Sequence, residues 1–287
     1  MAPPRTLMEY IQLASGHLKA CGIPTHRLDA EVLLAHILNL ERIQLYIQHD
    51  RPLTTAEVDA YRRAVARRAH REPVAYITGK REFFSIELLV DRRCLIPRPE
   101  TEILVETALE EIRQRFPEKP EIKVADIGTG SGAIAISVAK HEPRARVTAV
   151  DIDRDALDVA AANVQRTGVA DRVTLKLGEL LTPLGGEFFD AILSNPPYIS
   201  EEEWRHLAPD VRDYEPRQAL VGGKDGLAVI RQLIQEAKRS LAPGGFLAIE
   251  IGASQGDRVV ALAQASGYAK TRLVQDLAGL DRVVILS

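Results

Sequence analysis

Cysteine is scarce in this sequence, since only Cys21 and Cys94 occur among its 287 residues. Two cysteines build no disulfide framework, and these two lack the Cys-x-x-Cys spacing of a zinc site. The seven histidines show no metal-ligand spacing either. The sequence therefore predicts no metal site and a reducing, cytoplasmic compartment.

Long apolar runs and strong net charge are also missing. No stretch approaches the roughly 20 apolar residues of a membrane-spanning helix, and residues 1–13 lack the apolar core of a signal peptide. The net charge of −3 gives no general attraction to nucleic acid or anionic membranes. We therefore expect no membrane partner and no direct nucleic-acid partner, and we expect a monomer. The length favours two domains.

Residues 1–73 have the pattern of a small helical bundle. Apolar residues recur at helical spacing in residues 7–18 and 28–37. The segment "RIQLYIQ" predicts a short third helix. Thr54 or Thr55 would cap a fourth helix, with Glu57 in its first turn.

The fourth helix carries a run of arginines: Arg62, Arg63, Arg67, Arg68 and Arg71. The simpler interpretation is a helix face that water solvates, because charge runs seldom mean more. The alternative is a docking surface for an acidic or RNA-associated partner.

The pattern changes after residue 73. Alternating apolar residues from Phe83 to Val90 predict a β-hairpin within a linker, residues 74–96. From residue 97 to residue 287, strand-like and helix-like segments alternate, and the last 18 residues resemble a final hairpin. This pattern predicts an α/β domain with a doubly wound, mostly parallel sheet and an antiparallel edge.

A glycine-rich turn follows the first strand of this domain. It comprises Gly128, Thr129, Gly130, Ser131 and Gly132. Glycines let a backbone turn tightly and approach a ligand closely, and ligands bind at this edge of open α/β sheets. Asp151, at the end of the next strand, could accept both hydroxyls of a ribose. The turn lacks the Gly-Lys-Ser/Thr of a P-loop, which leaves a nicotinamide dinucleotide or S-adenosylmethionine.

The tetrapeptide Asn195-Pro196-Pro197-Tyr198 favours S-adenosylmethionine over a nicotinamide dinucleotide. It follows a buried strand whose end lies beside the cofactor crevice. The carboxamide oxygen of Asn195 and the carbonyl oxygen of Pro196 could accept from a planar NH2 group, with Tyr198 as a flat wall. This geometry suits methylation of an amide or aniline-like nitrogen, in which positioning and electrostatics supply the catalysis. Hydride transfer has no need of it.

These two motifs together resemble the class I S-adenosylmethionine-dependent methyltransferases of amino groups. Further segments, "PVAYITGKREFF", "LIPRPETEILVE", "LVGGKDGLAVI" and "DLAGLDRVV", resemble the release-factor glutamine N5-methyltransferases, the HemK/PrmC family. The resemblance is strong over roughly residues 70–287. It implies a Rossmann-like seven-stranded methyltransferase sheet behind a small N-terminal helical bundle and a linking β-hairpin.

The resemblance also implies roles for single residues. Residues 128–132 and Asp151 would hold S-adenosylmethionine, which leaves as S-adenosylhomocysteine, and Glu179 and Leu180 would border its adenine. Asn195 would contact both cofactor and substrate. Together with Pro196, Pro197 and Tyr198, it would hold the glutamine of the Gly-Gly-Gln motif in class 1 peptide chain release factors. The N-terminal bundle would dock the release factor.

The tetrapeptide alone is also compatible with two other classes of methyltransferase, which act on other substrates. An N6-adenine DNA methyltransferase shares it, but this chain shows no separate target-recognition domain, and its net charge is negative. A ribosomal-protein glutamine methyltransferase is the nearer alternative. That sister family begins the corresponding helix with Arg-Ser-Pro, so Arg98-Pro99-Glu100 favours release factors. Glu250, at the end of a strand, has no role that the sequence assigns.

Overall fold

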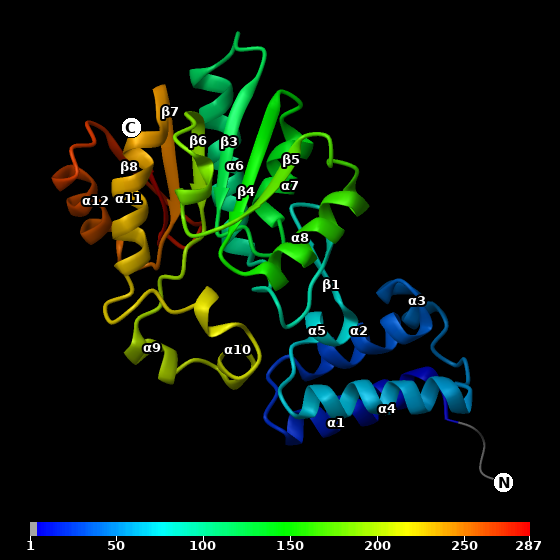
Figure 1. Ribbon diagram of the computed structural model, residues 1–287. Helices are drawn as coiled ribbons and strands as arrows, with labels where there is room; N and C mark the ends of the chain where they lie inside the picture. The colour runs from blue at the N-terminus through cyan, green and yellow to red at the C-terminus, as the bar shows by residue number, and fades with distance from the viewer. Residues whose placement is uncertain (1–4) are drawn as a thin grey trace. The chain divides into compact units, whose positions relative to one another are not determined.

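The computed structural model describes residues 5–287 and divides the chain into two compact units (Figure 1). One unit comprises the chain up to Gly79 together with Ala208–Tyr214. The other comprises Lys80–Leu207 and Glu215–Ser287. A segment from late in the sequence therefore belongs to the N-terminal unit.

The N-terminal unit is helical, as predicted. Its helices are α1 (Leu7–Ala20), α2 (His26–Leu38), α3 (Arg42–Ile47), α4 (Thr55–Ala69), α5 (Val74–Thr78) and α10 (Pro209–Arg212). Thr54 caps α4 in a reciprocal capping box with Glu57, which satisfies two backbone groups that the helix leaves open. Residues 74–78, expected at the start of the hairpin linker, form α5 instead, because Pro73 begins a helical turn and Gly79 ends it in the left-handed conformation.

The arginines at the end of α4 do not form a uniformly solvated helix face. The interpretation that water solvates them is wrong for Arg68. Its side chain is 5% exposed and its Nε lies 2.6 Å from Oδ2 of Asp29 on α2. Asp210 of α10 is a second partner at 3.4 Å. Arg68 therefore joins three helices, since α4 carries it. Arg67, by contrast, is exposed and pairs with Glu72.

Asp29→Asn is expected to lower the free energy of unfolding by about 3 kcal/mol, because a buried guanidinium loses its nearest charged partner. Urea unfolding measures the change. The control is Asp59→Asn, whose carboxylate is half exposed and 3.9 Å from Arg62; exposed pairs contribute about 0–1 kcal/mol. Equal effects of the two substitutions would contradict a structural role for the Arg68 pair.

The second unit begins with the predicted hairpin, β1 (Lys80–Phe83) and β2 (Ile86–Leu89). Asn163 ties it to the rest of the unit. Its side-chain amide accepts from the backbone N–H of Leu89 at 2.7 Å and donates to the carbonyl oxygens of Leu89 and Ser131, both at 2.9 Å. The hairpin thus packs beside the glycine-rich turn.

The predicted seven-stranded sheet with a terminal antiparallel hairpin is confirmed. Its strands are β3 (Ile122–Ile127), β4 (Ala145–Asp151), β5 (Val173–Leu177), β6 (Phe189–Ser194), β7 (Leu241–Glu250), β8 (Thr271–Gln275) and β9 (Asp281–Leu286). Their order is β5-β4-β3-β6-β7-β9-β8. The first five in this order are parallel, and β9 is antiparallel to both of its neighbours. Every side chain of β6 is buried, as in a central strand covered on both faces.

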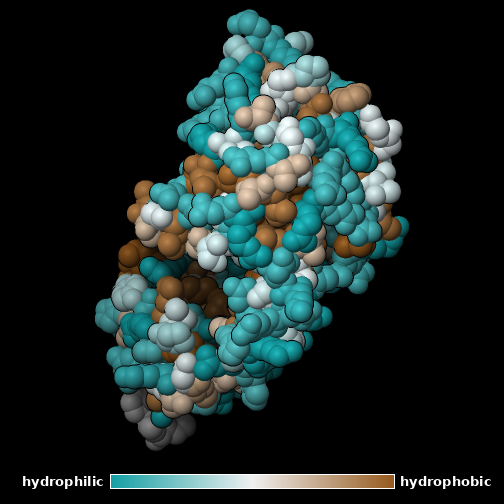
Figure 2. All heavy atoms as spheres, turned by 90° about the vertical axis from the view of Figure 1, so that its left-hand side faces the viewer, coloured by the Kyte–Doolittle hydropathy of each residue, from teal (hydrophilic) through white to brown (hydrophobic). Residues whose placement is uncertain are grey.

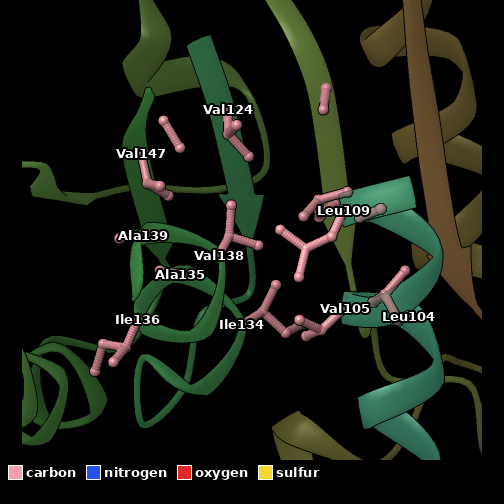
Figure 3. Close-up of a cluster of buried hydrophobic side chains, with 14 of the residues drawn as sticks. Leu104, Val105, Leu109, Val124, Ile134, Ala135, Ile136, Val138, Ala139 and Val147 are labelled. Atoms are coloured by element: carbon pink, nitrogen blue, oxygen red, sulfur yellow. The ribbon is translucent and has the colours of Figure 1, made fainter. Parts of the chain in front are cut away.

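Helices cover both faces of the sheet (Figure 1). One face carries α6 (Pro99–Arg115), α7 (Ala133–His141) and α8 (Arg154–Thr167), and the other carries α11 (Ala228–Ser240) and α12 (Gly256–Ala265). Figure 3 shows Leu109 of α6 and Val138 of α7 pointing toward each other, beside Val124 of β3. This packing fixes the beginning of α6 beside the carboxyl ends of the central strands.

Short elements complete the second unit: η1 (Thr182–Leu184), α9 (Glu201–Arg205) and η2 (Arg217–Ala219). Hydrophilic residues cover most of the face in Figure 2, and hydrophobic residues gather there in limited patches. None of the helices in residues 5–287 combines the length and the apolar character that crossing a membrane requires.

Candidate active site

The glycine-rich turn leads from β3 into α7 with three left-handed residues. Gly128, Gly130 and Gly132 have φ angles of +74°, +56° and +84°, a region that side chains disfavour. A Cβ at Gly128 or Gly130 would meet no protein atom within 4 Å, so these positions are open to a ligand. A Cβ at Gly132 would lie 3.1 Å from Ile136, so this glycine allows close helix packing instead.

Asp151, at the end of β4, holds this turn from the side. Its Oδ2 accepts from the backbone N–H of Gly130 at 2.8 Å, and its Oδ1 accepts from that of Asp153 at 2.9 Å. Burial raises the pKa of the Asp151 carboxyl. A carboxylate offers about four lone-pair sites, so Asp151 can still accept from a hydroxyl group of a ligand.

A pocket of about 330 Å³ opens between these elements, within the second unit. This volume lies in the range of small-molecule sites. Eight of the predicted site residues line it: Gly128, Gly130, Asp151, Glu179, Leu180, Asn195, Pro196 and Pro197. Sequence reasoning did not identify other lining residues, which include Cys94, Ile152 and Gln218.

Four predicted site residues do not line the pocket: Thr129, Ser131, Gly132 and Tyr198. Thr129 points inward, where its hydroxyl donates to Oδ2 of Asp126 at 2.6 Å. The carbonyl oxygen of Ser131 accepts from Asn163. Thr129, Ser131 and Gly132 therefore shape the turn rather than its ligand-facing surface, whereas Tyr198 belongs to the corner after β6.

Asp126, the last but one residue of β3, is a buried carboxylate at the base of the turn. Burial raises the pKa of this group to about 7. Its Oδ2 accepts from Thr129 and from the backbone N–H of Ala135, but Oδ1 has no partner in the described part of the chain. Such a group under a glycine turn is typical of a functional site.

The tetrapeptide forms a corner at the end of β6. The Nδ2 of Asn195 donates to the hydroxyl of Thr101 at 3.0 Å. Nothing in residues 5–287 donates to its Oδ1, and Asn195 lines the pocket. The hydroxyl of Tyr198 donates to Oε1 of Glu250 at 3.3 Å, and burial raises the pKa of Tyr198.

Backbone packing fixes the corner from behind. A Cβ at Gly222 would collide with the carbonyl oxygen of Pro197, and one at Gly226 would collide with that of Tyr198. Gln255 donates to the same carbonyl of Tyr198 at 2.9 Å. The segment "VGGKDGL", which contains both glycines, therefore supports the corner.

A partly buried ion pair fixes the entry to α6. Arg98 precedes the helix, and its guanidinium lies 2.5 Å from Oε1 of Glu215, whose side chain is 1% exposed. The other oxygen of Glu215 accepts from the backbone N–H of Ile96 at 3.1 Å. This pair holds the "RPETE" segment in place, and with it Thr101, the partner of Asn195.

Sequence reasoning missed Thr101, Asp126, Glu215 and Glu250 as members of the site. Polar residues inside buried strand ends were the available signal for Asp126 and Glu250. No pattern along the chain marks Thr101 or Glu215, because only the fold brings them to the corner. No group of three or more His, Cys, Asp or Glu side chains in the described residues could hold a metal ion.

The strand order, the glycine turn and the corner define an α/β methyltransferase. Residues 102–209 match the methyltransferase small domain and residues 9–79 match the PrmC N-terminal domain. A release factor glutamine methyltransferase of Rhodopirellula baltica is 43% identical over 283 residues, or 98% of this chain and 96% of that protein. One of Moorella thermoacetica is 44% identical over 278 residues, 96% of each chain. The chain belongs to the release factor glutamine methyltransferase family.

Solved structures with lower identity share the fold. The hMettl16 catalytic domain superposes with a TM-score of 0.57 at 16% identity, over 78% of this chain and 81% of that one. A methyltransferase from Pyrococcus furiosus superposes with a TM-score of 0.51 at 21% identity, over 77% and 95%. At these identities the likeness concerns the fold alone.

Gly226→Ala is expected to lower methyltransferase activity strongly, because its Cβ would displace the carbonyl oxygen of Tyr198 and so the corner. Gly279→Ala is the matched control: its φ of +77° resembles the +72° of Gly226, but its Cβ would meet no atom within 4 Å. Left-handed backbone costs each variant about 1–2 kcal/mol. The temperature of thermal unfolding should therefore fall in both variants, whereas methyltransferase activity should fall only in Gly226→Ala. Equal activities of the two variants would refute the role of Gly226 in supporting the corner.

Proposed function

We propose that this protein transfers a methyl group from S-adenosylmethionine to the side-chain amide nitrogen, N5, of a glutamine. The substrate is the glutamine of the Gly-Gly-Gln motif in class 1 peptide chain release factors. Relatives that match nearly the whole chain are called release factor glutamine methyltransferases, which supports both the reaction and the substrate.

The free carboxamide oxygen of Asn195 is the observation that carries this proposal. Asn195 and Pro196 both line the pocket, and the Nδ2 of Asn195 is engaged by the hydroxyl of Thr101. The carboxamide oxygen of Asn195 and the carbonyl oxygen of Pro196 would together accept from the two N–H groups of a primary amide, and Tyr198 would close the corner as a wall. Asn195, Pro196 and Tyr198 are thus the proposed catalytic residues, and Pro197 completes the substrate site.

A glutamine amide nitrogen is a weak nucleophile, because its lone pair is delocalised into the carbonyl group. Hydrogen bonds from both N–H groups to Asn195 and Pro196 would orient this lone pair toward the pocket. They would also strengthen as the nitrogen becomes tetrahedral and more positive, so they favour the transition state over the bound substrate. The corner needs no base, because the methylated nitrogen is acidic and can lose its proton afterwards.

S-adenosylmethionine would supply the electrophilic methyl group. Its fit is supported by the open glycines at 128 and 130, by the carboxylate of Asp151 and by the pocket volume. Residues 128–132 would hold the methionine part, and Asp151 would hold the ribose. Glu179 and Leu180 would border the adenine. Leu180 has a φ of +47°, a strained conformation that is often found at ligand sites.

Asp151→Asn is expected to weaken S-adenosylmethionine binding about tenfold or more, because hydrogen bonds to a charged acceptor contribute about 1.5–3 kcal/mol. Isothermal titration calorimetry with the cofactor measures the dissociation constant. Asp171→Asn, at a carboxylate 72% exposed to solvent, serves as the control and should leave it unchanged. An unaltered constant in Asp151→Asn would remove Asp151 from the cofactor site.

Asn195→Ala is expected to abolish methyl transfer, a loss of about a hundredfold or more, as for other groups that stabilise a transition state. Cofactor binding should largely survive. The assay incubates the protein with S-adenosylmethionine and a release factor and locates the methyl group by peptide mass spectrometry. Full activity of Asn195→Ala would refute the role of the corner. Methylation of DNA or of a ribosomal protein, with the release factor untouched, would refute the substrate.

The N-terminal bundle is the proposed docking domain for the body of the release factor. Residues 9–79 match the PrmC N-terminal domain, which supports a role specific to this family. We expect the protein to act as a monomer in the cytoplasm, where translation ends.

A further inference from the structure

Gln255 is a buried carboxamide that the sequence did not single out. It directly precedes α12 and is 6% exposed. Although it occupies the N-cap position, its side chain makes no hydrogen bond to the helix. Its Oε1 instead accepts from the backbone N–H of Gly252 at 2.9 Å, and its Nε2 donates to the carbonyl oxygen of Tyr198, also at 2.9 Å. The side chain therefore serves the corner rather than the helix that it begins.

These two hydrogen bonds allow only one orientation of the carboxamide. The N–H of Gly252 can only donate, and the carbonyl oxygen of Tyr198 can only accept. Turning the carboxamide over would break both hydrogen bonds at once. Position 255 thus requires a side chain that accepts at one end and donates at the other.

The connection between β7 and α12 is itself anchored to the sheet. The backbone N–H of Ile251 donates to the carbonyl oxygen of Arg282 at 2.9 Å, and that of Gln255 donates to the carbonyl oxygen of Gly252 at 2.9 Å. The residue before this connection, Glu250, pairs with β9. Gln255 therefore ties the corner to a segment whose position the sheet sets.

Tyr198 is held at both of its ends by this same stretch of chain. Its hydroxyl donates to Glu250 at 3.3 Å, and its carbonyl oxygen accepts from Gln255. Gly226 lies against the same carbonyl oxygen and leaves no room for a side chain there. The backbone and the ring of Tyr198 are thus fixed relative to the end of β7.

We infer that Gln255 is a positioning residue for the substrate glutamine, because it holds the carbonyl oxygen of Tyr198 and so places the corner against the substrate amide. This inference rests on the proposed function of the corner. A displacement of about 1 Å in an active site can cost a hundredfold in rate, so a single hydrogen bond behind the corner matters for catalysis. Gln255 does not line the pocket, so cofactor binding should not depend on it.

Gln255→Glu tests the inference, because its two protonation states differ in the one property that matters. An ionised carboxylate only accepts, whereas a protonated carboxyl can donate to Tyr198 and still accept from Gly252. With a release factor and saturating S-adenosylmethionine, kcat/KM of the ionised variant should fall about tenfold below wild type, the equivalent of one hydrogen bond. Since burial favours the protonated form, the ratio of variant to wild type should recover as the pH falls from about 8 to about 5.

A role in the helix alone predicts the opposite result. Negative charge near the N-terminus of a helix is stabilising, so an ionised glutamate at position 255 should serve α12 at least as well as Gln255 does. Positioning of the corner instead makes the ionised form the poor one. The direction of the pH dependence therefore separates the two roles.

Two further variants complete the experiment in the full-length protein. Gln255→Leu loses both hydrogen bonds and has no titrating group, so its kcat/KM should fall at every pH without recovery. Gln264→Glu is the matched control, since Gln264 is exposed on α12, and it should match wild type at every pH. Calorimetry should give every variant the cofactor affinity of the wild-type protein.

The ratio to wild type at each pH removes the titration of groups that all the proteins share. On the neighbouring elements these include Glu250 of β7, Asp281 of β9, Arg258 of α12 and Asp225 of the segment before α11. Circular dichroism checks folding over the same pH range. If Gln255→Leu does not fold, the ratio for Gln255→Glu decides. If Gln255→Glu also unfolds at high pH, the carboxamide serves the fold and the inference is overturned.

The outcomes separate this inference from the proposed function. If the wild-type protein does not methylate the release factor, the proposed function fails, and the inference fails with it. If the wild-type protein is active while both variants at position 255 keep its kcat/KM, or lose cofactor affinity in step with the rate, only the positioning role is overturned. A loss in Gln255→Glu that recovers at low pH, with a constant loss in Gln255→Leu and intact cofactor binding, supports it.

Discussion

The proposed reaction depends on one constraint: the Asn195 carboxamide must present its oxygen, not its nitrogen, to the substrate amide. The two ends of a carboxamide have nearly the same shape, so packing alone does not distinguish them; hydrogen-bond partners do. Thr101 is that partner, at 3.0 Å from the nitrogen. The ion pair between Arg98 and Glu215 and the packing of α6 on α7 then matter because they hold Thr101 in position.

The parallel sheet brings together parts of the site that lie far apart in the sequence. β4, β3, β6 and β7 are adjacent and parallel, so their carboxyl ends share one edge. Asp151, Asp126, Asn195 and Glu250 all lie at or next to these ends. Each strand thus contributes one polar side chain, and the neighbouring loops need only supply backbone groups and walls.

Most of the fold could be predicted from sequence, because the spacing of apolar residues and the turn residues between elements are local signals. Alternating strands and helices, the glycine turn and the final hairpin all follow from short windows of residues. The burial of Arg68 could not, since its partner Asp29 lies 39 residues away and an arginine run alone predicts solvent. The support of the corner by Gly222 and Gly226 was hidden for the same reason: a glycine in a loop gives no indication of which backbone lies against it.

Two buried carboxyl groups at the site lower the free energy of unfolding of the protein at neutral pH. Burial raises the pKa values of Asp126 and Glu250 to about 7, and each keeps one oxygen without a regular partner in the described residues. In the unfolded chain both groups titrate near pH 4. The folded protein therefore binds more protons between about pH 4 and 7, and the free energy of unfolding falls as the pH rises through this window. Asp126 lies at the base of the glycine-rich turn, and Glu250 contacts Tyr198 of the corner. A sequence selected for stability alone would replace both groups, so their positions beside the pocket argue that they serve the site rather than the fold.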